Sequence, residues 1–110
     1  MDLATEKRIL VVDDEPDIRN YLATCIEDHG FQIETAKDGL EALAKIETFQ
    51  PHLMTLDMVM PGMSGAKVIR QLRQSEKWAK LPIIVITAHA HDEFGEEDRK
   101  STRLNSSHRL

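Results

Sequence analysis

The sequence contains one cysteine, Cys25, and aromatic residues make up only 5% of it. A single cysteine cannot form a disulfide within the chain, so the fold must be stabilised by its hydrophobic core, and we expect a reducing, cytoplasmic location. Because aromatic side chains are few, that core must be mainly aliphatic. No apolar run approaches the roughly 20 residues that span a bilayer, and residues 1–8 are too charged for a secretory signal. We therefore expect no association with a membrane.

A cluster of basic residues is also missing. The 110 residues include 14 Lys and Arg against 19 Asp and Glu, which gives a formal net charge of -5 at pH 7. Proteins that bind nucleic acids carry basic patches that neutralise phosphates, so we expect this domain to bind no nucleic acid. The length suits a single domain with one modest core.

Short apolar segments alternate along the chain with segments of helical periodicity. Most of these apolar segments are apolar throughout, as in strands buried on both faces, whereas residues 31–36 alternate between apolar and polar, as in an edge strand. The predicted strands cover residues 9–12, 31–36, 53–56 and 83–86, and the predicted helices begin at Pro16, Asp38 and Ser64. This order predicts an α/β fold, with a parallel sheet, helices on both faces and right-handed crossovers.

The helix that begins at Pro16 carries apolar side chains at helical spacing. Such spacing predicts that one stripe of the helix faces the sheet, and Gly30 follows as a stop signal. The stripe consists of Ile18, Tyr21, Leu22, Cys25 and Ile26. We expect this stripe to be buried, together with the thiol of Cys25.

Residues that can carry chemistry follow the ends of three predicted strands. Asp13 and Asp14 follow residues 9–12, Asp57 follows residues 53–56, and Thr87 follows residue 86. In open parallel sheets, ligand sites lie outside the carboxyl ends of the strands, so we expect these side chains to share one pocket. The acids after residue 12 also suit the positive end of a helix dipole, and the sequence alone leaves that structural role open.

Three carboxylates in one pocket repel each other. Two like charges ~4 Å apart repel by about 4 kcal/mol at an effective dielectric constant near 20, and either a raised carboxyl pKa or a bound divalent cation relieves this repulsion. Mg²⁺ binds one or two carboxylates, a carbonyl oxygen and several waters in octahedral geometry. The predicted ligands are Asp13, Asp14, Asp57 and the backbone carbonyl of Val59, in the turn that follows the third strand.

These motifs resemble the receiver domain of two-component response regulators. The resemblance rests on Asp13-Asp14, on the run DMVMPGMSG at residues 57–65, and on Thr87-Ala88, and it covers residues 7–98. It implies a flavodoxin-like, doubly wound sheet in three α/β/α layers, with the strands in the order 2-1-3-4.

The resemblance also implies a role for each site residue. Asp57 is the phosphoacceptor, which takes a phosphoryl group from a sensor histidine kinase or a histidine phosphotransfer protein by nucleophilic attack. Asp14 and Asp57 hold Mg²⁺ directly, and Asp13 holds it mainly through water. Thr87 bonds a phosphoryl oxygen and acts as the switch, while Ala88 is small and places its backbone near the phosphate. Such a domain is a signalling switch rather than an enzyme, because it catalyses only its own phosphorylation and dephosphorylation.

Two features of that family have no counterpart in this chain. Receiver domains carry a fifth strand that ends in Lys-Pro, and an aromatic switch residue on that strand, whereas residues 100–110 show no apolar period. We therefore expect an incomplete receiver domain over residues 1–99, without the fifth strand and last helix, and a tail at residues 100–110 that does not belong to the family. The uncovered strand Ile83–Ile86 would then form a hydrophobic sheet edge, so we expect a domain that is marginally stable or that self-associates through this edge.

Two other functions remain open from the sequence. Without the lysine, the domain could be an interaction module that does not sustain phosphorylation. A Mg²⁺-dependent phosphohydrolase also uses an aspartyl nucleophile, but such enzymes commonly carry a second acid two residues later, where this chain has Val59.

Overall fold

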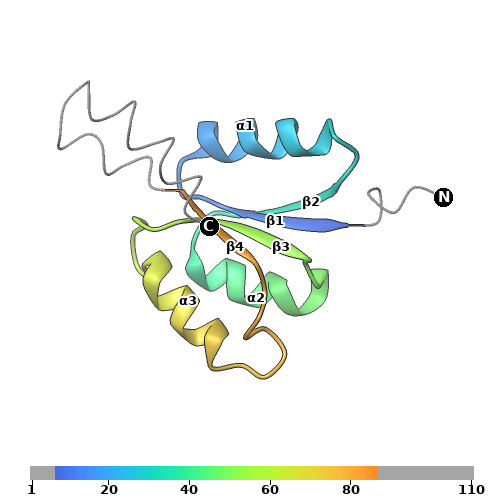
Figure 1. Cartoon of the computed structure of the whole chain (residues 1–110). Coiled ribbons are helices and arrows are strands. Elements are labelled where there is room, and N and C mark those ends of the chain that lie inside the picture. Colours follow the sequence, from blue (N-terminus) through green and yellow to red (C-terminus); the bar gives the residue numbers. More distant parts are fainter. Residues whose placement is uncertain (1–6, 87–110) are drawn as a thin grey trace.

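The computed structural model describes residues 7–86, in which four strands alternate with three helices (Figure 1). The elements are β1 (Arg8–Val12), α1 (Pro16–Glu27), β2 (Gln32–Ala36), α2 (Gly39–Phe49), β3 (Leu53–Asp57), α3 (Gly65–Arg73) and β4 (Ile83–Ile86). The predicted order of strands and helices is confirmed over this range. The predicted tail, residues 100–110, lies outside the described residues.

Local sequence determines where α2 and α3 begin. The Asp38 carboxylate accepts a hydrogen bond from the Glu41 backbone amide at 2.8 Å, and the Ser64 hydroxyl accepts one from the Lys67 amide at 3.3 Å. Each bond satisfies a backbone donor that has no partner inside its helix. Helix α1 begins differently, because its N-cap residue makes no side-chain capping bond and its first turn starts at Pro16.

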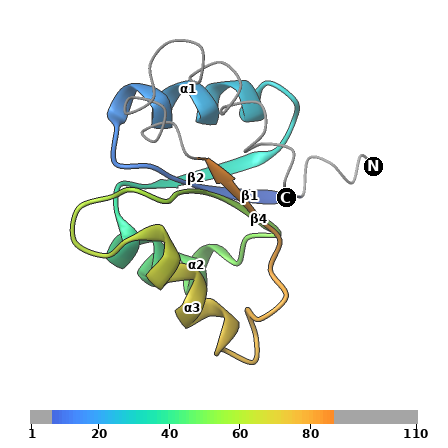
Figure 2. The same cartoon turned by 60° about the vertical axis from the view of Figure 1, so that its left-hand side comes forward.

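The strands form one parallel sheet in the order β2-β1-β3-β4, as predicted. Strand β1 pairs with both β2 and β3, so that Val12 lies between Ala36 and Leu56. At the other end of the order, Asp57 of β3 pairs with Ile86 of β4. Helix α1 covers one face of the sheet, and α2 and α3 cover the opposite face (Figures 1 and 2). The described residues therefore form three α/β/α layers.

Most of the hydrophobic core lies between the sheet and the layer of α2 and α3. Successive side chains of a strand point to opposite faces, so alternate strand residues meet the apolar sides of these helices. The buried cluster consists of Leu10, Val12, Ala36, Ala42, Ile46, Met54, Leu56, Met60, Val68, Leu72, Trp78, Leu81 and Ile83. Trp78 is its one aromatic member, so the core is mainly aliphatic, as the composition predicts.

The prediction of a buried stripe on α1 is wrong. No residue of α1 is buried, Tyr21 is 68% exposed, and Cys25 is half-buried. Helix α1 packs against β2 and β1, and within the described residues no second helix lies beside it on this face of the sheet (Figures 1 and 2), so its stripe is only partly covered. No helix within residues 7–86 is both long and apolar enough to cross a bilayer.

Strand β4 also differs from its prediction. Its uniformly apolar sequence predicts a strand buried on both faces, but only Ile83 is buried and the other three residues are half-buried. The reason is the position of β4 at the end of the strand order among the described residues. An outer strand is covered by neighbours on one side only.

Candidate metal site

Two of the three predicted site aspartates, Asp13 and Asp14, directly follow the end of β1. The Asp13 amide donates to the Ala36 carbonyl oxygen at 3.1 Å, which extends the pairing with β2 by one residue. The Asp13 carboxylate then accepts a hydrogen bond from the Glu15 amide at 2.9 Å and turns the chain toward Pro16. Asp13 is 1% exposed. A side chain that bonds its own backbone two residues on is typical of an Asx turn, and this turn fixes where Asp14 leaves the sheet.

The third predicted site aspartate lies at the end of β3. Asp57 is the last residue of the strand and is 1% exposed. Its Oδ1 accepts a hydrogen bond from the Val59 amide at 3.0 Å, which holds the carboxylate beside the loop that leads to α3. Val59 itself is 53% exposed. The turn therefore holds a buried, hydrogen-bonded carboxylate next to a residue that is exposed to solvent.

Helix α3 begins directly against this strand end. The Gly65 amide donates to the Met58 carbonyl oxygen at 3.1 Å. A Cβ atom at position 65 would lie 2.6 Å from the Asp57 carbonyl oxygen and 2.7 Å from the Met58 Cα. Only glycine allows so close an approach, so the start of α3 packs on the backbone that carries Asp57.

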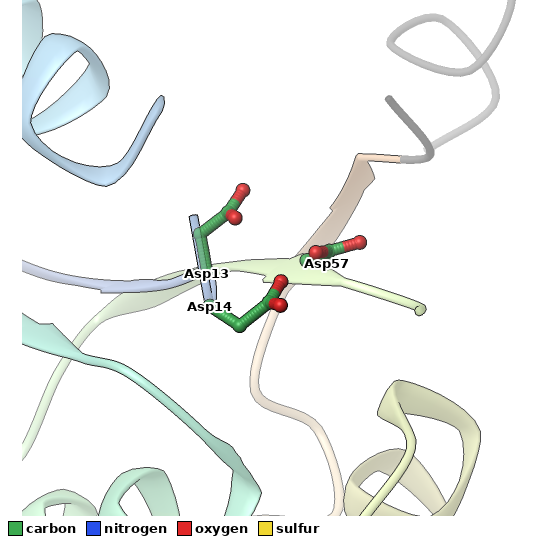
Figure 3. Close-up of side chains that lie close together, drawn as sticks. All are labelled: Asp13, Asp14 and Asp57. Carbon is green, nitrogen blue, oxygen red and sulfur yellow. The ribbon is translucent and has the colours of Figure 1, made fainter. Parts of the chain in front are cut away.

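The three aspartates meet at the carboxyl ends of β1 and β3 (Figure 3). Each of Asp13, Asp14 and Asp57 offers one carboxylate oxygen, and these oxygens all lie within 4.8 Å of one another. Asp13 and Asp57 are buried, and Asp14 is half-buried. The structure thus brings together the acids that the sequence singled out. Thr87 and Ala88 lie outside the described residues.

The donor set fits a hard divalent cation. Ligand oxygens of Mg²⁺ are about 3.0 Å apart at neighbouring positions and about 4.2 Å apart at opposed positions, since each Mg–O bond is about 2.1 Å long. The three carboxylate oxygens, all within 4.8 Å of one another, lie near this range. At a separation of ~4 Å an ionised pair repels by about 4 kcal/mol at an effective dielectric constant of 20. Oxygen ligands without thiols or imidazoles favour Mg²⁺ over Zn²⁺ or copper. Two of these acids are buried, where charges interact more strongly than in bulk water.

Two neighbours of this site were not predicted from the sequence. Arg19 Nη1 donates to the Asp13 carbonyl oxygen at 2.8 Å, and Gly65 contacts the Asp57 backbone. Nothing in the local pattern marks Arg19, which is a polar residue on an amphipathic helix. For Gly65 the available signal was a glycine in the first turn of a helix, where other residues are better helix formers.

A comparison with models of protein families shows which family the chain belongs to. The model of the response regulator receiver domain matches residues 9–101. The chain belongs to this family. Receiver domains of response regulators are signalling domains that histidine kinases phosphorylate, and they bind Mg²⁺ at an acidic pocket. The phosphohydrolase hypothesis has no support from this match.

Two curated relatives are bacterial regulators. The chain is 45% identical over 82 residues to the alkaline phosphatase synthesis transcriptional regulatory protein PhoP of Bacillus subtilis, covering 74% of this chain. It is 39% identical over 94 residues to the phosphate regulon transcriptional regulatory protein PhoB of Pseudomonas aeruginosa, covering 86% of this chain. The chain spans only 33% of the length of PhoP and 39% of that of PhoB. The match is therefore to the receiver part of longer proteins.

A solved structure supports the same assignment. The response regulator protein TrrA of Thermotoga maritima, in complex with Mg²⁺ and BeF, superimposes with a TM-score of 0.71 at 38% sequence identity. The superposition covers 94% of this chain and 83% of TrrA. The flavodoxin-like receiver fold, with strand order 2-1-3-4 over the described residues, is thereby confirmed.

Proposed function

We propose that this receiver domain accepts a phosphoryl group at Asp57 in a Mg²⁺-dependent step of phosphorelay signalling. The supporting observation is the meeting of three carboxylates, from the ends of β1 and β3, within 4.8 Å. A carboxylate attacks phosphorus with one oxygen and forms an acyl phosphate, while the bond from phosphorus to the donor breaks. The Val59 amide holds Oδ1 of Asp57, so the nucleophile is oriented before the donor arrives.

Mg²⁺ would be held by Asp14, by Asp57 and by the carbonyl oxygen of Val59, with Asp13 bonded through water. When bound, the ion supplies positive charge that offsets the charge on the transferring phosphoryl group. TrrA of Thermotoga maritima, to which this chain is similar, was solved with Mg²⁺ and BeF, which supports the choice of metal. Asp14 is half-buried, whereas Asp13 and Asp57 are buried.

We assign the switch role to Thr87, with Ala88 giving the phosphate room to approach. Ile86 is the register partner of Asp57, and Thr87 is the next residue along the chain, which favours contact with a phosphoryl oxygen on Asp57. The donor would be a sensor histidine kinase or a histidine phosphotransfer protein in the cytoplasm. The domain itself would bind neither nucleic acid nor membrane.

Phosphorylation of the 110-residue chain tests this proposal. The protein is incubated with Mg²⁺ and acetyl phosphate, and the peptide that contains residue 57 is examined by mass spectrometry. We expect an acyl phosphate on Asp57 of the wild type. None should form when EDTA is present during the incubation, and none should form in the Asp57→Asn variant. An unmodified Asp57 in the presence of Mg²⁺ would contradict the proposal and would favour the interaction module without phosphorylation. Multiple turnovers of a phosphate ester would instead identify a phosphohydrolase.

A further inference from the structure

Arg19 holds the backbone between the two acids that follow β1. Its amide donates to the Glu15 carbonyl oxygen at 2.9 Å, which places Arg19 in the first full turn of α1. From there Nη1 reaches back to the Asp13 carbonyl oxygen at 2.8 Å. Helix α1 is thereby tied to the loop that enters it, by a bond that does not belong to the helix.

The carbonyl that Arg19 bonds belongs to the peptide unit between Asp13 and Asp14. A peptide unit is planar, so a bond to its oxygen restricts the rotation that would move the Asp14 Cα and, with it, the Asp14 carboxylate. Two further bonds hold the chain on either side of this peptide unit: the Asp13 amide donates to the Ala36 carbonyl oxygen, and the Glu15 amide donates to the Asp13 carboxylate across Asp14. The N-cap residue Glu15 makes no side-chain capping bond. Arg19 therefore restrains the peptide unit that leads directly into Asp14.

We propose that Arg19 is a positioning residue for the metal site, which holds the Asp13–Asp14 peptide so that the Asp14 carboxylate faces Asp57. This inference rests on the proposed function, in which the three acids hold Mg²⁺. A hydrogen bond from a charged donor is roughly twice as strong as a neutral one. Arg19 makes this bond to a carbonyl oxygen and not to a carboxylate, so it orients the acids without occupying a metal ligand.

The positive charge of Arg19 affects Mg²⁺ affinity in the direction opposite to that of its positioning role. A cation beside the acids repels Mg²⁺, so removing Arg19 would tighten Mg²⁺ binding if charge were its whole effect. Positioning predicts weaker binding on removal. The sign of the change in Mg²⁺ affinity therefore separates the two roles.

The experiment compares Mg²⁺ dissociation constants of the 110-residue chain and its variants by calorimetric titration. We expect Arg19→Gln to weaken binding by about tenfold, which is typical for residues that orient metal ligands. The control Arg70→Gln removes the same charge from an exposed position of α3 and should leave the affinity nearly unchanged. A second control, Trp78→Phe, loses the bond from the Trp78 indole to Glu47 at 3.0 Å. It should lower stability without changing Mg²⁺ affinity.

The variant Arg19→Lys keeps the positive charge but replaces the planar guanidinium group with an ammonium group on a shorter side chain. We expect its affinity to lie between those of the wild type and Arg19→Gln. If Arg19→Gln does not fold, Arg19→Lys decides: binding weaker than wild type supports the inference, and unchanged binding overturns it. If the wild type binds Mg²⁺ and Arg19→Gln binds it equally well or more tightly, only the inference fails. If the wild type does not bind Mg²⁺, the proposed function fails together with the inference.

Discussion

Replacement of Gly65 by alanine tests how α3 supports the phosphoacceptor strand. The added Cβ would lie 2.6 Å from the Asp57 carbonyl oxygen, about 0.8 Å short of the 3.4 Å at which ordinary contact begins. Two of the three nearest atoms are backbone, so α3 must move away from β3 to relieve the clash. Overpacking of this kind costs about 1–3 kcal/mol, and the better helix propensity of alanine returns up to about 1 kcal/mol. We expect a net loss of about 1–2 kcal/mol in the free energy of unfolding.

Urea unfolding followed by the fluorescence of Trp78, the single tryptophan of the chain, measures this loss. The matched control is Gly62→Ala, because Gly62 has φ +80 and a Cβ atom added there would meet no atom within 4 Å. That variant reports the cost of a left-handed backbone alone, about 1–2 kcal/mol. Because Gly65 contacts the Asp57 carbonyl, Gly65→Ala should also slow phosphorylation of Asp57, which Gly62→Ala should affect less. A Gly65→Ala protein with wild-type stability and wild-type phosphorylation would refute the proposed contact.

Three further predictions follow from the site, the strand ends and the sheet edge. Asp57→Asn removes one charge from the cluster of acids; we expect urea unfolding without Mg²⁺ to show a more stable protein, and a less stable one would contradict this. Burial, and next the charge of Arg8, lower the pKa of His52 below its ordinary 6.5, and its Nδ1 accepts a hydrogen bond from the Arg8 amide at 3.0 Å. The contribution of neutral His52 to the free energy of unfolding is therefore complete above pH 6.5 and is lost as the pH falls through the lowered pKa. From pH 7.5 to 5, the free energy of unfolding should decrease less for His52→Asn than for wild type, and equal decreases would count against this prediction. Finally, the half-buried outer strand β4 should cause self-association, so sedimentation should show a mass that rises with concentration, whereas a constant monomer mass would exclude it.

Local sequence predicted the features of the fold that depend on neighbouring residues. The caps at Asp38 and Ser64 were recognisable because capping joins residues three positions apart. Strands β1 and β3 were recognisable because buried parallel strands are mainly apolar runs, and β2 was recognisable by its alternation of apolar and polar residues. The grouping of the three acids followed from the rule that parallel strands end at the same edge of a sheet.

Features that depend on which elements lie beside one another, or on exact packing, were not predictable. Tyr21 is 68% exposed, and helical spacing alone does not say how much of an apolar stripe other elements cover. The half-buried state of β4 depends likewise on its place at the end of the strand order among the described residues. The contact of Arg19 with Asp13 depends on the path of the loop between them, which the sequence does not specify.

A titration with Mg²⁺ followed by backbone amide resonances tests most directly whether Asp13, Asp14 and Asp57 form one metal site. We expect saturable shifts concentrated at residues 12–15 and 56–60, at the ends of β1 and β3, and their loss in the Asp57→Asn variant. Amides at the opposite ends of the same strands, such as Arg8 and Leu53, should remain unchanged. Resonances at the strand ends that do not respond to Mg²⁺, or that respond equally in Asp57→Asn, would contradict the account.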